Sequence, residues 1–212
     1  MGIPQKLRVS AGTGRWGPRK PLSQLLEEAF VRCRDMDASL AERLQAFADA
    51  VRQFGPQFQD AVDVLVERLR QYDVGENAPK PGDKMPNFVL PDERGQLISL
   101  DTLLESGPVA VTFHRGYWCP YCRINTRALA EAQDQIVAEG GQVAAIMPDR
   151  EHFTAELKAE SDAPFPILTD FDNGYALSLN LAFWVGDIEG CGSDRLCQEV
   201  KRVNVSAAFF LS

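Results

Sequence analysis

Three features are scarce in this 212-residue sequence, and each absence excludes a class of protein. No stretch approaches the roughly 18 consecutive apolar residues that a membrane-spanning helix requires. Basic residues number 22 against 30 acidic ones, and the formal charge of −8 opposes binding to nucleic acid or anionic lipid. Glycine and proline, at 16 and 13 residues, are too few for a collagen-like or low-complexity chain. We therefore expect a globular protein that binds neither nucleic acid nor membranes.

The first 21 residues are basic and contain no acidic side chain. A mitochondrial transit peptide would share that composition, but Gly12, Gly14, Gly17 and Pro18 interrupt any amphipathic helix here. No apolar segment resembles a secretory signal, which favours a protein of the cytoplasm. The sequence thus predicts a flexible basic tail over residues 1–21.

Residues 22–75 carry apolar side chains at helical spacing and are expected to form a helical extension. Ser39 and Glu42 make a capping box for a helix that a Gly-Pro pair ends. One further helix is expected before it and another after it, at residues 22–35 and 58–75. Their apolar faces are expected to pack on each other, on the following domain or on a second subunit.

A linker over residues 76–84 separates this extension from residues 85–212, where the composition changes. There, β-rich apolar runs alternate with segments of helical periodicity, which is typical of an α/β sandwich with a partly parallel sheet. Asp101 and Asp149 are expected to cap helices. In this region we expect a hairpin at residues 88–100, a strand at 109–113 and a helix at 122–138. Further strands are expected at 142–147 and 165–168.

Five cysteines, an odd number without a secretory signal, argue against a framework of disulfides. Cys119 and Cys122 form a Cys-x-x-Cys motif where the strand at 109–113 gives way to a helix, the arrangement of thioredoxin-like redox proteins. Cys119 is expected at the helix N-terminus, whose positive dipole end favours a thiolate. Lowering a thiol pKa by about 1.5 units needs only about 2 kcal/mol, which one such terminus and one cation supply. The motif therefore predicts a redox-active pair.

Residues around the motif support the same interpretation. Arg115 and Arg123 would add positive potential, Pro120 fits the first helical turn, and Trp118 would shield the pair from water. The first cysteine of the motif is thus the predicted nucleophile. The second, one helical turn along, is predicted to close the disulfide.

Other interpretations of the cysteines and histidines stay open. Cys-x-x-Cys also forms half of many zinc sites, but Cys191 and Cys197 are five residues apart and make a poor second half, so no metal is expected. The motif could instead be two inert core thiols. His114 either pairs with a reactive cysteine or simply ends a strand, and Cys33 is expected to be a packed helical thiol. Cys191 and Cys197 either serve as auxiliary thiols, paired or resolving, or stay unpaired.

Several motifs together resemble the peroxiredoxin (alkyl hydroperoxide reductase/thiol-specific antioxidant) family. Gly82–Phe88, Leu90–Asp92 and Gly95 resemble its opening hairpin. Thr112–Cys122 resembles the reactive-cysteine segment of the branch that carries a Cys-x-x-Cys. Phe165–Asp170 and Asn173–Ala176 resemble a later strand and helix of that branch, and the helical extension fits its N-terminal region.

The resemblance implies a thioredoxin-like fold, with a central mixed sheet flanked by helices, and a thiol-dependent peroxidase. Cys119 would be oxidised by a hydroperoxide to a sulfenic acid, and Cys122 would resolve it to a disulfide. A thioredoxin- or glutaredoxin-like electron donor would then reduce the pair, and no cofactor is implied.

The sequence also departs from the family pattern. Thr112 and Gly116 stand where typical peroxiredoxins have the Pro and Thr that help to bind peroxide. This favours, as a rival, a thiol–disulfide oxidoreductase with little peroxidase activity. Ser206 stands in place of the usual cis-proline, before a strand expected at 203–211. The C-terminal end of the fold is therefore expected to be incomplete, which leaves a homodimer or a non-catalytic redox-sensing or interaction module as further alternatives.

Overall fold

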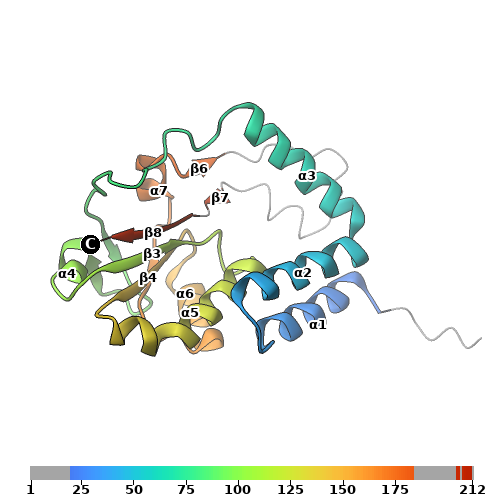
Figure 1. Ribbon diagram of the computed structural model, residues 1–212, viewed down its shortest axis with the longest axis horizontal. Coiled ribbons are helices and arrows are strands. Elements are labelled where there is room, and N and C mark those ends of the chain that lie inside the picture. The colour runs from blue at the N-terminus through green and yellow to red at the C-terminus, as the bar shows by residue number, and fades with distance from the viewer. Residues whose placement is uncertain (1–19, 184–203, 206, 212) are drawn as a thin grey trace, which may run out of the picture.

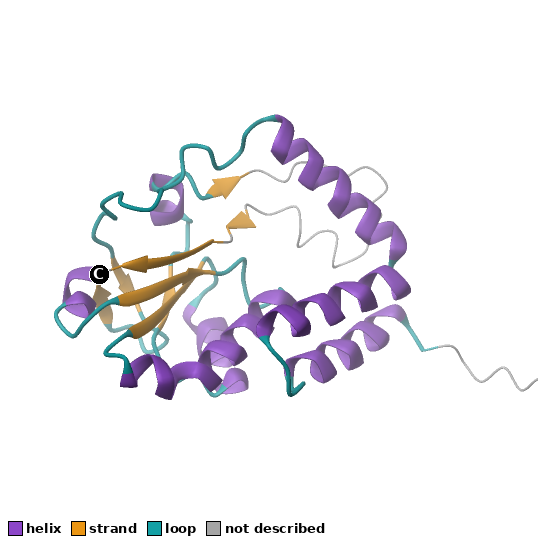
Figure 2. Cartoon of the chain, viewed as in Figure 1, coloured by secondary structure: helices purple, strands orange, loops and turns teal. Residues whose placement is uncertain are grey.

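The computed structural model describes residues 20–183, 204–205 and 207–211 (Figures 1 and 2). The predicted basic tail lies almost wholly outside the described residues. The same holds for Cys191, Cys197 and Ser206, so the structure does not address their predicted roles. No helix among the described residues is long and apolar enough to cross a membrane.

A four-stranded mixed sheet forms the centre of the molecule, in the order β5-β4-β3-β8. Strands β3 (Val109–Phe113), β4 (Gln142–Met147) and β5 (Ile167–Thr169) are parallel to one another, and β8 (Ala207–Leu211) is antiparallel to β3. The buried-strand predictions at 109–113 and 142–147 are confirmed, and the last parallel strand begins two residues later than predicted. The expected C-terminal strand is two short strands, β7 (Asn204–Val205) and β8, of which β7 pairs with β6 (Ala182–Phe183).

Both faces of the sheet are covered, because successive strand residues point to opposite sides. Val109, Val111 and Phe113 face one core with hairpin β1 (Val89–Pro91)–β2 (Leu97–Ser99), helix α4 (Leu100–Leu104) and helix α7 (Gly174–Ser178). Ala110 faces the other core, under α5 (Pro120–Ala138) and α6 (Glu151–Ser161). The predicted α/β sandwich with helices on both faces is therefore confirmed. The Cys-x-x-Cys motif lies where β3 leads into α5 (Figure 1).

The helical extension is also present, as α1 (Leu22–Arg34), α2 (Leu40–Phe54) and α3 (Pro56–Gln71). The predicted capping box is formed, since the Ser39 and Glu42 side chains each bond to the other residue's backbone amide. Helices α1 and α2 pack side by side and bury Phe30 and Phe47 against Ile124 of α5. Helices α1 and α2 thus pack on each other and on the following domain, two of the three partners predicted for their apolar faces.

Two predicted helix caps are wrong. Ser99, not Asp101, caps α4, and its hydroxyl accepts a hydrogen bond from the Thr102 amide at 3.0 Å. Arg150, not Asp149, occupies the N-cap of α6 and makes no side-chain cap bond. Asp149 instead bonds to the loop before the cysteines, as described below. Helix α5 begins at Pro120, two residues before the prediction, because proline suits the first helical position.

Candidate active site

The two cysteines of the motif lie at the N-terminal end of α5. Cys119 is the N-cap residue, Pro120 is the first helical residue, and Cys122 is one turn along. Both thiols are free and buried, with 1% of Cys119 and 6% of Cys122 exposed. The strand-to-helix placement predicted for the motif is confirmed. A reagent reaches either sulfur only when the surrounding side chains move.

Arg115 contacts both sulfur atoms. Its guanidinium donates a hydrogen bond to the Cys119 sulfur at 3.0 Å, and its backbone amide donates to the Cys122 sulfur at 3.3 Å. The Arg115 guanidinium also lies near two aromatic rings, 5.9 Å from the Trp118 ring centroid and 5.8 Å from that of Tyr121. The side chain that supplies positive charge to the pair is thus Arg115, and two aromatic rings fix its position.

The two thiols share a proton in the reduced protein. The hydrogen bond with Cys119 lowers the pKa of Cys122 to about 6, with further lowering by Arg115, whereas burial raises the pKa of Cys119. Interacting groups of this kind titrate as a pair rather than singly. At neutral pH the pair therefore carries one thiolate. The remaining S–H group and Arg115 both donate hydrogen bonds that stabilise it.

Arg123, the other predicted source of positive potential, serves a different purpose. Its guanidinium donates two hydrogen bonds to Glu160 of α6, at 2.6 and 2.9 Å, and lies 3.9 Å from the Phe30 ring centroid. Glu160 also accepts a hydrogen bond from Arg34 at 2.9 Å. The prediction for Arg123 is therefore wrong: its charge is neutralised in a network that joins α1 to α5 and α6.

Gly116 and Asp149 shape the loop that precedes the cysteines. Gly116 has φ +138°, a conformation that side-chain-bearing residues rarely adopt, and an added Cβ would lie 2.7 Å from the Trp118 ring nitrogen. The Asp149 carboxylate accepts a hydrogen bond from the Tyr117 amide at 2.6 Å. Sequence reasoning missed this role of Asp149. Its position just beyond β4 was the available signal, because neighbouring parallel strands end at the same edge of the sheet.

His114 lies directly after β3 and is buried beneath the site. The Thr126 hydroxyl donates to the Cys122 carbonyl at 2.9 Å, and so it accepts from His114 Nδ1, 3.4 Å away. The Thr112 hydroxyl, 2.9 Å from His114 Nε2, supplies the other partner. Burial lowers the pKa of His114 to about 4, so the ring is neutral at pH 7. Both ring nitrogens are thus occupied by threonines, and neither bonds to a cysteine, which favours the strand-end interpretation.

The domain that carries the two cysteines is similar to known proteins. The sequence model of the AhpC/TSA family matches residues 81–184, which include the cysteine motif and three parallel strands. This region is therefore similar to the AhpC/TSA family. No curated protein matches the sequence.

Solved structures share the fold of the domain that carries the two cysteines. Peroxidoxin BcpB from Mycobacterium tuberculosis aligns with a TM-score of 0.50 and 19% identity, over 61% of this chain and 75% of that one. The bacterioferritin comigratory protein of Xanthomonas campestris, described for its alkyl peroxide reduction activity, aligns with a TM-score of 0.49 and 13% identity, over 59% and 73%. Hypothetical protein SMc02350 of Sinorhizobium meliloti aligns with a TM-score of 0.44 and 28% identity, over 50% of this chain and 62% of that one. The fold is thioredoxin-like, as predicted.

Two helices of the helical extension, α2 and α3, pack against aromatic residues beside the cysteines. The Tyr121 ring packs edge-on against Phe47 of α2, with 5.1 Å between ring centroids. Trp118 packs with Leu65 and Leu69 of α3. Tyr121 and Trp118, the aromatic residues near Arg115, are thus held by helices that lie outside the region matched by the family model.

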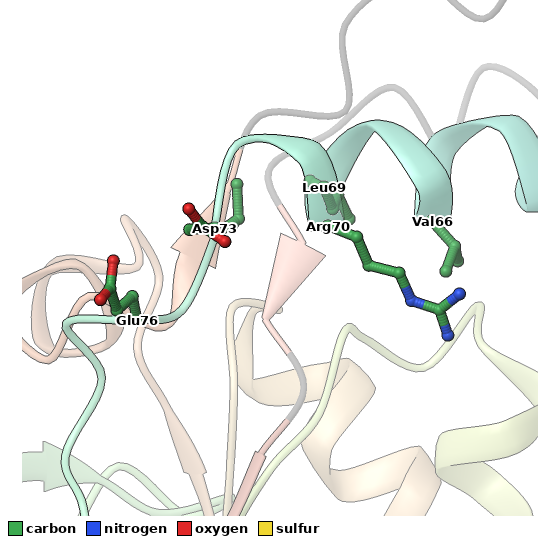
Figure 3. Close-up of a pocket in the computed structure, with 6 residues that line it drawn as sticks. Val66, Leu69, Arg70, Asp73 and Glu76 are labelled. Atoms are coloured by element: carbon green, nitrogen blue, oxygen red, sulfur yellow. The ribbon is translucent and has the colours of Figure 1, made fainter.

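In the described part of the chain, neither the hollow along α3 nor Cys33 adds a reactive group to this site. An open hollow of about 420 Å³ runs along the end of α3 and the turn after it, and its lining contains no cysteine or histidine (Figure 3). Cys33 is buried in the core between α1, α2 and α5, where burial raises its pKa, as expected of a packed thiol. In the part of the chain that the structure describes, no three His, Cys, Asp or Glu side chains are grouped to hold a metal ion.

Proposed function

We propose that this protein is a thiol-dependent peroxidase that reduces hydroperoxides through Cys119 and Cys122. The observation that carries the proposal is the 3.0 Å hydrogen bond from the Arg115 guanidinium to the Cys119 sulfur at the N-terminus of α5. That contact favours a thiolate, the form of cysteine that attacks peroxides. The match of the AhpC/TSA family model to residues 81–184 supports the same chemistry.

In the proposed reaction the shared proton passes from Cys119 to Cys122, the Cys119 thiolate attacks the terminal peroxide oxygen, and the O–O bond breaks. The leaving oxygen takes a proton and departs as an alcohol or water, while Cys119 becomes a sulfenic acid. The Cys122 sulfur then attacks Cys119, releasing water and forming the disulfide. Cys122 is suited to this step because its lowered pKa keeps it reactive at neutral pH.

A second candidate is a thiol–disulfide oxidoreductase with little activity toward peroxides. Two positions favour it. The Thr112 hydroxyl is buried and bonded to His114, and Gly116 has no side chain with which to donate a hydrogen bond to peroxide. A site without those donors loses part of the stabilisation that the O–O cleavage needs, while thiol–disulfide exchange does not depend on them.

The proposed partners are a hydroperoxide substrate and a cellular thiol that reduces the disulfide, in a reducing compartment such as the cytoplasm. A homodimer is also proposed, because β8 forms an edge of the four-stranded sheet among the described strands.

The test is a rapid-mixing assay in which the reduced protein meets a stoichiometric amount of hydrogen peroxide. Sulfenic acid is trapped with dimedone and located by mass spectrometry. We expect oxidation at Cys119 at least about a hundredfold faster than that of free glutathione at the same pH, which is the size of effect that a positioned donor supplies. Cys119→Ser should abolish this reaction, and the matched control Cys33→Ala should leave it unchanged.

The outcomes separate the candidates. Slow reaction with peroxide, together with rapid exchange with a small disulfide, would replace the peroxidase by the oxidoreductase. Failure of both reactions would leave a redox-sensing or interaction module. Retention of fast oxidation in Cys119→Ser would move the nucleophile to another residue.

A further inference from the structure

Arg115 is a partly buried cation whose only anionic partner among the described residues is the cysteine pair. Its guanidinium bonds to the Cys119 sulfur at 3.0 Å, and the buried Nε atom has no hydrogen-bond partner. No described carboxylate lies within ion-pair distance of it. The other arginines near the site differ in this respect, since Arg34 and Arg123 both pair with Glu160.

Oxidation removes that partner. The reduced pair carries a thiolate at neutral pH, whereas a disulfide is uncharged and a weak acceptor. The partly buried guanidinium near the Trp118 and Tyr121 rings would then have no anion to compensate for its lost hydration. This arrangement stabilises the reduced state relative to the oxidised one, and a dithiol whose reduced form is stabilised makes an oxidising disulfide.

The surroundings of the pair restrict what reduces it. Cys119 and Cys122 are nearly inaccessible, and α2 and α3 hold the aromatic residues beside them through Phe47 and Leu65. A folded dithiol protein needs an exposed surface around the sulfur atoms on which to dock. A small thiol needs only a local opening of one side chain.

From the Arg115 contact and the walled site we propose that the Cys119–Cys122 disulfide is strongly oxidising and is reduced directly by a monothiol of the glutathione class. The inference rests on the proposed function, because it concerns the disulfide that the reaction forms. A first thiolate attacks one sulfur, the S–S bond breaks, and the other sulfur leaves as the thiolate that Arg115 stabilises. A second monothiol then attacks the sulfur of the first monothiol in the mixed disulfide, and the second cysteine is released. Two monothiols thus supply two electrons, and the products are their disulfide, the reduced pair and one proton.

The equilibrium is tested in glutathione buffers at pH 7 that also contain thioredoxin as an internal reference. After anaerobic equilibration, free thiols are alkylated and counted by mass spectrometry in each protein. At the glutathione ratio that half-reduces thioredoxin, the reduced-to-oxidised ratio of Cys119–Cys122 should be at least tenfold higher. Arg115→Met should lower that ratio at least tenfold, equivalent to about 30 mV for a two-electron couple. Arg115→Lys should keep part of the effect.

Arg150→Met is the matched control, since Arg150 is exposed and contacts the Phe171 ring rather than a sulfur. It removes the same charge and should leave the ratio unchanged. Circular dichroism of each variant in both redox states verifies folding. In a kinetic arm, glutathione should reduce the oxidised protein at least as fast as thioredoxin does at equal thiol concentration.

Several results would overturn the inference. A ratio equal to or below that of thioredoxin would contradict the oxidising disulfide, and equal ratios in wild type, Arg115→Met and Arg115→Lys would remove Arg115 as its cause. Faster reduction by thioredoxin would reject the small-thiol donor. Failure to form any Cys119–Cys122 disulfide at every glutathione ratio would overturn the proposed function itself, which distinguishes the two failures.

Discussion

The neutral, buried His114 makes a prediction about acid stability. In the folded protein burial lowers the pKa of His114 to about 4, against an ordinary value of 6.5 in an unfolded chain. Between these two pH values His114 is protonated in the unfolded chain and neutral in the folded protein. Stability therefore rises with pH in this window, and it is lost as pH falls from about 6.5 toward 4. Applied between pH 7 and pH 5, the two pKa values give a loss of about 2 kcal/mol in the free energy of unfolding.

Urea denaturation at pH 7, 6 and 5 measures this loss. Carboxylates with lowered pKa values, such as Glu160, contribute mainly below pH 5, whereas the Cys122 thiol, with a pKa of about 6, also titrates in the chosen range. The contribution of His114 is therefore the difference in this loss between wild type and a variant without the histidine. His114→Asn removes the titrating group and should flatten the pH dependence, although the variant is less stable at pH 7 because it loses hydrogen bonds. His152→Asn is the control, since His152 is exposed and is the only other histidine. An equal loss in wild type and His114→Asn would refute the assignment.

Three further predictions follow from the site and its supports. Gly116→Ala should lower the free energy of unfolding by about 1–3 kcal/mol, because φ is +138° and the new methyl meets Trp118; an unchanged urea midpoint would contradict it. Phe47→Ala should cost about 3–5 kcal/mol in the same assay, since Phe47 is buried and packs on Tyr121, and a cost near zero would show that α2 is not held there. The equilibrium constant for reduction of the pair by glutathione should rise with pH above about 6 and approach a tenfold rise per unit between pH 7 and 8, because the pKa of Cys122 is about 6 and each reduction then releases one proton. A pH-independent constant would mean that the reduced pair carries no thiolate.

Local sequence signals determined much of this protein. The burial of all five residues of Val109–Phe113 follows from an apolar, β-rich run, and the Ser39–Glu42 capping box follows from side chains three residues apart. Pro120 fixes the start of α5, because it needs no hydrogen-bond partner for its nitrogen there. The placement of Cys119 at a helix N-terminus, and hence the redox interpretation, depended only on such nearby residues.

Tertiary structure decided which charges reach the sulfur atoms. Arg115 and Arg123 each lie four residues from Cys119 in the sequence, yet only Arg115 contacts its sulfur, because Glu160 from a distant helix pairs with Arg123. Likewise, Asp149 looked like a helix cap until the sheet brought it beside the loop of Tyr117. Pairings of this kind depend on which elements pack together, and one-dimensional spacing does not encode them.

The same reason explains the role of the helical extension. Its helices were predictable from apolar periodicity, but that pattern is identical whether the partner is another helix, a domain or a subunit. Only the packed structure shows Phe47 against Tyr121 and Leu65 against Trp118, beside the reactive pair. Local chemistry in the sequence therefore determined where the cysteines lie, and long-range packing decided what surrounds them.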